Sequence, residues 1–405
     1  MENKLKAKIR FEGFTEDWEK RKFSNIVSRV SKQSNDANLP KVEFEDIVSG
    51  EGQLNKDISH KFDDRKGIAF EPNFILFGKL RPYLKKWLLP NFKGIALGDF
   101  WVFESKNSSS IFNYYLIQTA EYQIVANLSS GTKMPRSDWK TVSETEFRVP
   151  SINEQTKIGE FFKRIDDTIV LHQQELTALK QTKLGFLQKM FPKEGESVPE
   201  VRFPEFSGDW QQCKFEDVLN KQDGIRRGPF GSALKKEFFV KDSDYAVYEQ
   251  QNAIYDNYKT RYNISKEKFE ELKNFQLSEG DFILSGAGTI GRISRVPKGI
   301  KQGVFNQALI RFKIDEDITD SEYFIQWIRS ESMQKKLTGG NPGSAITNLV
   351  PMSEVKKWNV MVPIKNEQIK IGNFFKQLDE TIALHQRELD TLKETKKAFL
   401  QKMFA

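Results

Sequence analysis

The chain has 405 residues, of which 38% are hydrophobic and 29% charged, a balance typical of a soluble globular protein long enough for two or three domains. Its net charge of +7 permits nucleic-acid binding without requiring it, and its single cysteine, Cys213, excludes an internal disulfide framework and cysteine-based zinc sites. Because the sequence has no run of eighteen apolar residues and no apolar N-terminal segment, we expect no membrane span, no secretory signal and a cytoplasmic location.

A short motif occurs near the start of each half of the chain. Residues 9–18 read I-R-F-E-G-F-T-E-D-W and residues 201–210 read V-R-F-P-E-F-S-G-D-W, and K-F begins four residues after each tryptophan. We call this the leading motif. Its recurrence at an offset of 192 residues indicates two similar units.

The first leading motif is followed by an interior that extends to residue 148. Residues 42–48, 67–70 and 74–77 are short apolar runs bounded by glycine or proline, and such runs are typical of strands. Over residues 111–128 apolar residues recur at spacings of three and four, which predicts a helix.

The second interior, residues 215–361, has corresponding pieces although its sequence has diverged. A strand is expected over residues 281–284 and a helix over residues 322–337. A glycine-bearing loop follows the helix of each interior, at residues 130–136 and 339–344. We therefore predict two divergent versions of one mixed α/β domain.

A segment of 43 residues closes each half, at residues 149–191 and 362–404, and the two copies are identical at 29 positions with an offset of 213. Both contain N-E-Q-x-K-I-G-x-F-F-K, then L-H-Q-x-E-L, and end in F-L-Q-K-M-F. Apolar residues alternate at spacings of three and four over more than four heptads, which predicts a coiled coil. The predicted seam residues are Ile158, Phe162, Ile165, Ile169, His172, Leu176 and Leu179 in the first copy, and Ile371, Phe375, Leu378, Ile382, His385, Leu389 and Leu392 in the second.

The orientation of the two helices follows from the short linker between the halves, residues 192–200, whose prolines cannot continue a helix. A parallel pair would need a long return connection, so we predict an antiparallel pair that brings the C-terminus back beside the first leading motif near Arg10. The alternative is two surface helices that each lie on their own domain. His172 and His385 are predicted to meet at the centre, and two histidines without a third ligand favour polar seam residues over a metal site.

The sequence contains no pattern of a catalytic or cofactor site. Residues 286–291 spell G-x-G-x-x-G, but a second strand-like run ended by Pro297 follows, and position 311 is an arginine where a dinucleotide site needs an acidic residue. A hairpin turn is the favoured interpretation. The chain also lacks a phosphate-binding G-x-x-x-x-G-K-[S/T] loop and has only three histidines, so we predict no catalytic, cofactor-binding or metal-ligating residues.

What remains for function is a set of basic, aromatic and small polar residues in the loops of the two interiors. Lysine and arginine bind phosphates, and arginine and asparagine also read base edges, so clusters of them beside glycine turns favour DNA binding over solvated surface charge. The candidate DNA-binding residues are Lys79, Arg81, Tyr83, Lys85, Lys86, Lys133 and Arg136 in the first interior, and Arg226, Arg227, Ser232, Lys235, Arg292, Arg295, Asn341 and Ser344 in the second.

The leading motifs and the repeated segments together resemble the specificity subunit of Type I restriction-modification systems. The resemblance covers the whole chain, and its most specific parts are the N-E-Q segments and the closing F-L-Q-K-M-F, each present twice. It implies two α/β target recognition domains, residues 1–148 and 201–361, in a pseudo-twofold arrangement. Residues 149–191 and 362–405 would form the antiparallel two-helix coiled coil that separates them. The second interior is longer by 21 residues, which suggests that the two half-sites are read in different ways.

In that family each target recognition domain reads one half of a split DNA sequence. The resemblance therefore implies a bipartite double-stranded DNA target, two methyltransferase subunits docked on the helices, and restriction or motor subunits. S-adenosylmethionine, ATP and Mg²⁺ are expected on those partners, while this chain is expected to be non-catalytic and to bind no cofactor. The alternative is a coiled-coil adaptor of a multiprotein complex that does not bind DNA, which would need no basic recognition loops.

Overall fold

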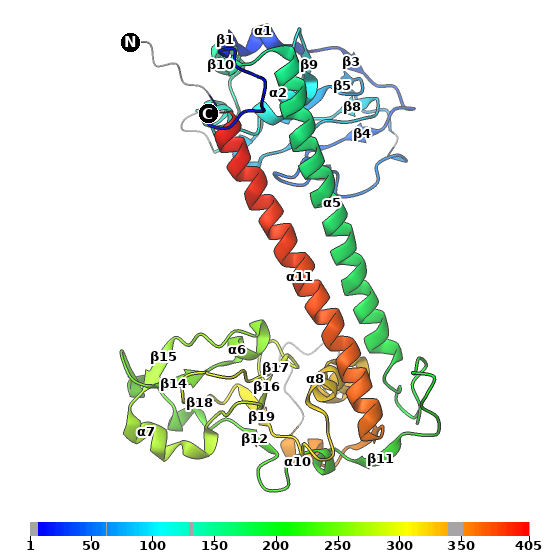
Figure 1. Ribbon diagram of the computed structural model, residues 1–405, viewed down its shortest axis with the longest axis vertical. Helices are drawn as coiled ribbons and strands as arrows, with labels where there is room; N and C mark the ends of the chain where they lie inside the picture. Colours follow the sequence, from blue (N-terminus) through cyan, green and yellow to red (C-terminus); the bar gives the residue numbers. More distant parts are fainter. Residues whose placement is uncertain (1–6, 62, 129–132, 339–350, 405) are drawn as a thin grey trace. The chain divides into compact units, whose positions relative to one another are not determined.

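The computed structural model describes residues 7–61, 63–128, 133–338 and 351–404. The chain divides into two compact units, one made of Met1–Gln174 with Gln386–Ala405 and the other of Glu175–His385. Each unit contains one mixed α/β domain and one half of each of two long helices, α5 (Ile152–Lys189) and α11 (Lys365–Met403) (Figure 1). Within the described ranges, no helix combines the length and apolar content that crossing a bilayer would require.

Over the residues that the structure describes, the first domain has ten strands with short helices between them. Its elements are β1 (Glu19–Lys22), α1 (Phe23–Ile26), β2 (Val27–Val30), β3 (Gln33–Ser34), β4 (Lys41–Val42), η1 (Phe44–Asp46), β5 (Gly67–Phe70), β6 (Ile75–Gly78), η2 (Pro82–Leu84), β7 (Trp87–Leu88), β8 (Gly94–Ala96), β9 (Phe100–Ser105), α2 (Ser110–Leu116), α3 (Ala120–Ala126), α4 (Trp139–Glu144) and β10 (Glu146–Val149).

Two four-stranded sheets make up most of this domain. The first has the order β2-β9-β6-β7 and is antiparallel throughout, and the second has the order β3-β5-β8-β4, with β4 parallel to β8. Alternate residues of the first sheet face different cores, because side chains alternate along a strand. Ile75 and Phe77 pack with the helices, whereas Leu76 packs into a smaller core with Val42 and Phe70 from the second sheet.

The second domain has a similar set of elements. They are β11 (Gln211–Lys214), η3 (Phe215–Val218), β12 (Ile225–Arg227), η4 (Gly231–Ala233), η5 (Lys236–Phe238), β13 (Phe239–Val240), β14 (Tyr245–Tyr248), α6 (Gln250–Tyr255), β15 (Tyr262–Ile264), α7 (Lys266–Glu271), η6 (Lys273–Phe275), β16 (Phe282–Ser285), β17 (Ile293–Arg295), β18 (Gly303–Phe305), β19 (Leu309–Phe312), α8 (Ser321–Arg329), α9 (Glu331–Leu337), α10 (Met352–Val355) and β20 (Asn359–Val362).

The first sheet of the second domain, β12-β19-β16-β17, matches the first sheet of the first domain strand for strand. Its alternation is also the same, since Phe282 and Leu284 pack with the helices while Ile283 faces a smaller core. The second sheets differ: the order is β13-β15-β14-β18 in the second domain, so the strand that follows the β16–β17 hairpin, β18, lies at an edge, whereas the strand that follows the β6–β7 hairpin, β8, is central. The mixed α/β prediction is confirmed, and the divergence lies mainly in the second sheets.

Several predicted elements have different bounds in the structure. The strand predicted over residues 67–70 is β5, and the one over 74–77 is β6 displaced by one residue. The strand predicted over residues 42–48 is wrong beyond Val42, because the carboxylate of Asp46 accepts a hydrogen bond from the backbone N–H of Glu43 (2.8 Å) and closes a turn of 3-10 helix.

The single helix predicted in each interior is two helices. In the first domain the chain breaks between α2 and α3, where the Thr119 hydroxyl accepts a hydrogen bond from the Tyr122 N–H and caps the second helix. In the second domain Ser330 has an extended backbone between α8 and α9. Apolar spacing alone did not reveal these breaks, because the apolar residues continue in phase across them.

The leading motif binds the start of the long helix that closes its own domain. The strand that directly follows the motif pairs with the strand that directly precedes the long helix, β1 with β10 and β11 with β20. Its arginine donates two hydrogen bonds to the buried glutamate of N-E-Q, at 2.8 and 2.7 Å from Arg10 to Glu154 and at 2.7 and 2.7 Å from Arg202 to Glu367. The two most specific sequence motifs are therefore parts of one clamp.

The glutamine and the glycine that follow this glutamate hold the long helix against another helix of its own domain, α2 in the first domain and α8 in the second. Gln155 accepts a hydrogen bond from the N–H of Ser109, the residue that caps α2, and Gln368 accepts one from the N–H of Asp320, which caps α8, both at 2.9 Å. A Cβ on Gly372 would lie 2.6 Å from a backbone nitrogen of α8. The repeated N-E-Q-x-K-I-G thus encodes a close helix crossing.

The two long helices run antiparallel within each unit. In the first unit Phe161 of α5 packs on Phe399 of α11 with ring centroids 5.1 Å apart, and in the second unit Phe186 packs on Phe374 at 4.9 Å. In the first unit the Asp166–Lys396 ion pair lies further along α5 but further back along α11 than this ring contact, and in the second unit the Lys183–Asp379 pair lies further back along α5 but further along α11, as expected from the short linker. The predicted antiparallel orientation is confirmed.

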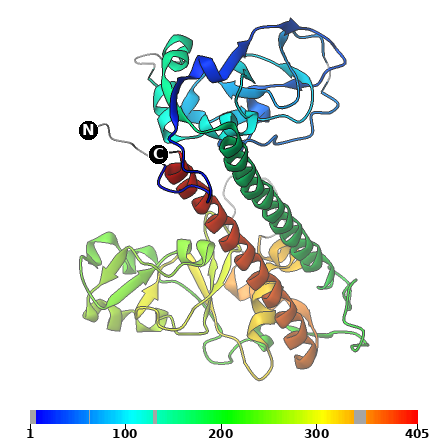
Figure 2. The same cartoon turned by 45° about the horizontal axis from the view of Figure 1, so that its top comes forward.

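Each long helix ends in the core of a domain. Met403 and Phe404 are buried in the first domain, where the Phe404 ring stacks on Phe112 at 5.1 Å. The Ile9 N–H of the leading motif donates to the carbonyl of Lys402 (3.3 Å), which confirms the predicted return of the C-terminal end to the first leading motif (Figure 2). The second domain repeats this arrangement with Met190, Phe191 and a hydrogen bond from Val201 N–H to the Lys189 carbonyl at 2.9 Å.

The predicted seam residues lie on the covered side of the two helices. Those nearest the domains, such as Phe162 and Phe375, belong to a domain core as well as to the helix pair. The buried ones are Ile158, Phe162, Ile169, Leu176, Ile371, Phe375 and Leu389, and the half-buried ones are Ile165, His172, Leu179, Leu378, Ile382, His385 and Leu392.

Candidate nucleic-acid interface

The strand register brings three loops of the second domain to one end of its first sheet. Arg227, at the end of β12, pairs with Ile310 near the start of β19, and Ser285, at the end of β16, pairs with Leu309. The loops at residues 228–232, 286–292 and 306–308 therefore meet at this end. We call it the hairpin end of the sheet, because the β16–β17 hairpin turns there.

The first domain has the same hairpin end. Gly78, the last residue of β6, pairs with Phe100 at the start of β9, and Phe77 pairs with Trp87 of β7. The β6–β7 hairpin loop, residues 79–86, corresponds to the β16–β17 loop of the second domain. It contains five of the candidate DNA-binding residues, namely Lys79, Arg81, Tyr83, Lys85 and Lys86.

The β6–β7 loop has a constrained backbone. Arg81 and Lys85 both adopt left-handed conformations, with φ of 47° and 52°, on either side of the 3-10 turn of η2. Such conformations are unfavourable for residues with a side chain, and persist only where the surroundings fix them. The Arg81 N–H donates to the carbonyl of Pro135 (2.7 Å), and Tyr83 at the tip is 54% exposed. The loop thus holds an aromatic and basic tip toward solvent.

Of the other two candidates in the first domain, Lys133 and Arg136, the second lies next to this loop, because Leu80 pairs with Arg136 in an isolated β-bridge. Arg136 donates to both carboxylate oxygens of Asp99, at 3.2 and 3.1 Å, and the Lys79 Nζ lies 3.7 Å from the same carboxylate. The hydrogen bond from Arg136 lowers the pKa of Asp99 below its ordinary value. Arg136 and Lys79 are therefore partly neutralised, whereas Lys85 and Lys133 are exposed.

In the second domain the structure separates the candidates that the sequence grouped together. Arg226 and Arg227 lie in β12 and Arg295 lies in β17, the opposite edge strand, so only Arg292 occupies a loop comparable to residues 79–86. The expectation that all of them lie in comparable loops is wrong, because the ladder with β19 and β16 extends through them.

Several of these side chains form ion pairs with nearby carboxylates. Arg226 donates to Asp223 (2.9 Å), Arg295 to Glu322 (3.1 Å), and Lys235 lies 3.6 Å from Glu237. Arg227, Ser232 and Arg292 are exposed. Asn341 and Ser344 lie outside the described residues.

The G-x-G-x-x-G segment forms the turn of the β16–β17 hairpin, as the sequence predicted. Phe282 pairs with Arg295 and Leu284 with Ile293 in antiparallel register, and the turn between them contains Gly288 and Gly291 with φ of 64° and 81°. Because the segment leads into a strand rather than a helix, it lacks the helix N-terminus that binds a pyrophosphate.

A basic groove lies between the hairpin end and the long helices in each unit, with volumes of about 470 Å³ in the first unit and about 440 Å³ in the second. Equivalent positions line both grooves. The first is lined by Lys85, Gln118, Gln123, Lys393 and Lys396, among others, and the second by Lys180, Lys183, Arg292, Arg329 and Gln334.

One ion pair beside each groove joins the two helices. In the first unit Lys396 contacts Asp166 at 2.7 Å, and in the second unit Lys183 contacts Asp379 at 2.5 Å. Burial raises the pKa of Asp166 and lowers the pKa of Lys183, so in both pairs the loss of solvation opposes ionisation. These pairs fix the helix register at a cost in solvation.

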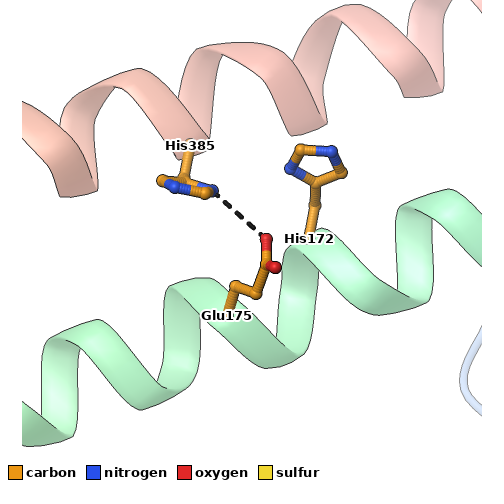
Figure 3. Close-up of side chains that lie close together, drawn as sticks. All are labelled: His172, Glu175 and His385. Carbon is orange, nitrogen blue, oxygen red and sulfur yellow. Dashed lines mark ion pairs between the residues drawn. The ribbon is translucent and has the colours of Figure 1, made fainter.

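The seam histidines each face a glutamate that the sequence interpretation did not single out. His385 Nδ1 lies 3.5 Å from a carboxylate oxygen of Glu175 in the second unit (Figure 3), and His172 Nδ1 lies 3.7 Å from Glu388 in the first. Both glutamates come three residues after a histidine in L-H-Q-x-E-L, a spacing that puts histidine and glutamate on one helix face. That spacing could have predicted them.

The fold places this chain among proteins with two duplicated mixed α/β domains and paired long helices. A model of the Type I restriction modification DNA specificity domain matches residues 15–181 and 207–394, once in each half of the chain. The chain belongs to this family. The specificity subunit of the Type I restriction enzyme MjaVIII from Methanocaldococcus jannaschii is 21% identical over 328 residues, which are 76% of this chain and 73% of that protein.

Solved structures share the fold at low sequence identity. The Type I restriction-modification S subunit from M. genitalium superimposes with a TM-score of 0.60 at 13% identity and covers 99% of both chains. A chain from a structure of type I R-M complex assembly and conformational transition gives a TM-score of 0.59 at 15% identity, over 97% of this chain and 99% of that one.

Family membership settles the class of function. As a Type I specificity subunit, this chain recognises a DNA sequence, is not itself catalytic, and acts with DNA and the other subunits of a restriction-modification complex. This favours the DNA-binding prediction over the adaptor that does not bind DNA.

Proposed function

We propose that the chain recognises a bipartite DNA target, and that each domain contacts one half-site with the hairpin end of its first sheet. The observation that carries this proposal is the repetition of that end in both units. The same strand order delivers a basic loop to the same place twice, with Lys79, Arg81 and Lys85 in one loop and Arg292 in the other. A protein that reads two separated half-sites needs two such surfaces.

The differences between the domains support two different half-sites. The β6–β7 loop has the sequence K-L-R-P-Y-L-K-K, whereas the β16–β17 loop is rich in glycine. Base recognition depends on the side chains that reach the groove, and phosphate contacts only position them. Two hairpin ends with unlike side chains would therefore read unlike sequences, as the unequal lengths of the interiors also suggest.

The repeated helices would dock two copies of one partner, for which the proposed identity is the methyltransferase subunit. Leu171 of α5 and Leu384 of α11 occupy equivalent positions and are 53% and 49% exposed, although both are large and apolar. Equivalent apolar positions presented twice suit two identical partners. S-adenosylmethionine would then bind those partners, ATP and Mg²⁺ would bind restriction or motor subunits, and we expect a cytoplasmic location because the substrate is DNA.

The proposal is tested with the chain purified together with its methyltransferase. We expect this complex to shift duplex DNA and to methylate it only where both halves of a bipartite site are present. Arg81→Ala should relax recognition of one half-site and Arg292→Ala of the other, as these residues lie on different domains. If neither substitution changes affinity or site preference, the hairpin ends are not the reading surfaces.

A further inference from the structure

Phe230 has a large apolar side chain that is nevertheless almost fully exposed to solvent. It is 87% exposed, and among the residues that the structure describes it is the only phenylalanine with a largely exposed side chain. A single exposed apolar residue is common on protein surfaces, so exposure alone implies nothing. The conformation and position of the surrounding loop make it informative.

The loop that carries Phe230 is anchored on both sides of the ring. Gly228 donates its N–H to the Leu309 carbonyl (3.0 Å), and a Cβ at Gly228 would lie 1.9 Å from the Asn306 carbonyl oxygen. Pro229 is buried, and the Phe230 carbonyl accepts a hydrogen bond from the Ala233 N–H (2.9 Å). Because neighbouring residues fix this backbone, little backbone entropy is left to lose when the ring binds.

The position of the ring is the hairpin end of the second domain. Phe230 follows β12 directly, and the same end of the sheet carries the β16–β17 turn and Arg292. Apart from Gly231, the exposed residues nearest to it in the chain are Ser232 and Arg227. An aromatic ring is thus presented from a basic and polar surface rather than from an apolar patch.

We propose that Phe230 is an apolar wedge that inserts at one base step of the half-site read by the second domain. DNA-binding proteins use phenylalanine and other apolar side chains in this way, and the partly unstacked base packs on the ring while nearby arginines bind phosphates. This inference rests on the proposed bipartite DNA recognition and adds to it a residue that determines local DNA deformation. It also predicts that the half-site read by the second domain contains a base step that unstacks easily.

A protein partner is the less favoured occupant. Protein interfaces surround an aromatic anchor with further apolar residues that exclude water. The loop around Phe230 instead has glycines on both sides and charged residues at Arg227, Lys235 and Lys236. The surroundings therefore suit a phosphate-lined groove.

The test uses the chain in complex with its methyltransferase and a duplex that contains its methylated site. 2-Aminopurine replaces single adenines in turn across both half-sites, because its fluorescence rises when the base unstacks. Apart from the methylated bases themselves, which the methyltransferase would flip out of the duplex, we expect the wild-type complex to give a rise at one step of one half-site. Phe230→Ala should abolish this rise and weaken specific binding roughly tenfold to a hundredfold, as expected for loss of one base-stacking contact.

Matched variants separate the wedge from other effects. Phe230→Trp should retain the fluorescence rise, and Tyr255→Ala, which removes another aromatic ring that is 75% exposed in the same unit, should leave both fluorescence and affinity unchanged. Thermal stability should be the same for all three variants. Unchanged fluorescence and affinity in Phe230→Ala would overturn the inference and leave bipartite recognition standing.

Two further outcomes are distinguishable. Loss of methyltransferase association by Phe230→Ala in the absence of DNA would show that the ring contacts a protein, and would also overturn the inference. Failure of the wild-type complex to bind any bipartite site would overturn the proposed function itself.

Discussion

The clamp between the leading motif and the long helix gives the most quantitative prediction. Glu367 is fully buried, and its carboxylate accepts hydrogen bonds from Arg202 at 2.7 and 2.7 Å and from the Trp210 indole N–H at 3.2 Å. In Glu367→Gln the side chain keeps its shape but loses its charge and one acceptor. The Arg202 guanidinium then remains largely buried, with its side chain 17% exposed.

Breaking one side of a buried ion pair typically costs about 3–5 kcal/mol, because the remaining charge is desolvated without compensation. Arg202 also donates to the Gly208 carbonyl (2.5 Å), and the glutamine oxygen still accepts one bond, so we expect the lower end, about 3 kcal/mol. As a control, Glu200→Gln breaks the pair with Lys189, whose side chains are 47% and 51% exposed, and should cost less than about 1 kcal/mol.

The assay is urea unfolding followed by circular dichroism, combined with hydrogen exchange of residues 201–214 to localise the loss. Because a chain with two domains need not unfold in one step, the exchange rates decide where stability is lost. The double variant Glu367→Met with Arg202→Met removes both charges and should recover part of the loss. If Glu367→Gln costs less than about 1 kcal/mol, or if exchange increases elsewhere instead, the clamp does not hold the leading motif.

Two other predictions address the long helices. Gly372→Ala should destabilise the second unit by about 1–3 kcal/mol, because the added Cβ would meet α8. Gly185 has open space around it, so Gly185→Ala should stabilise α5 by about 0.5–1 kcal/mol. Urea unfolding of both variants measures these changes, and equal effects would refute the close crossing. Burial raises the pKa of Asp166 above its ordinary 3.8, so its contribution to stability is full below 3.8 and is lost as pH rises through the folded pKa. Asp166→Asn should therefore lower the free energy of unfolding by more at pH 4 than at pH 7, measured by urea unfolding at both pH values. A larger loss at pH 7 than at pH 4 would contradict the raised pKa.

The sequence predicted the large-scale organisation because that organisation is encoded redundantly. Two copies of a 43-residue segment are enough to recognise duplication, and a linker of nine residues with two prolines is enough to choose an antiparallel pair. Apolar heptad spacing then identified which helix face is covered. These features depend on periodicity and chain length, which can be read without knowing any contact.

The features that the sequence did not predict depend on individual hydrogen bonds. The break at Thr119 and the turn closed by Asp46 each result from a single capping group, and the break at Ser330 from one residue with an extended backbone, within otherwise regular apolar patterns. The sequence also did not reveal which basic side chains are held in ion pairs. Arg136 and Lys133 look alike in sequence, yet Arg136 is bound to Asp99, 37 residues away, and Lys133 is exposed.

The interiors were the least predictable part because their function selects against a common pattern. The two first sheets kept one strand order, and the loops at their hairpin ends diverged. Arg226, Arg227 and Arg295 were expected in loops, but their strands are only three residues long, which is too short for a period to identify.

The central claim is that two unlike hairpin ends read two halves of one DNA target. Its most direct test is sequencing of methylated bases in cells that express this chain with its methyltransferase. We expect one methylated motif made of two unlike specified halves separated by unspecified bases, with specificity relaxed in only one half by Arg292→Ala. A continuous motif, or a change in both halves from that single substitution, would contradict it.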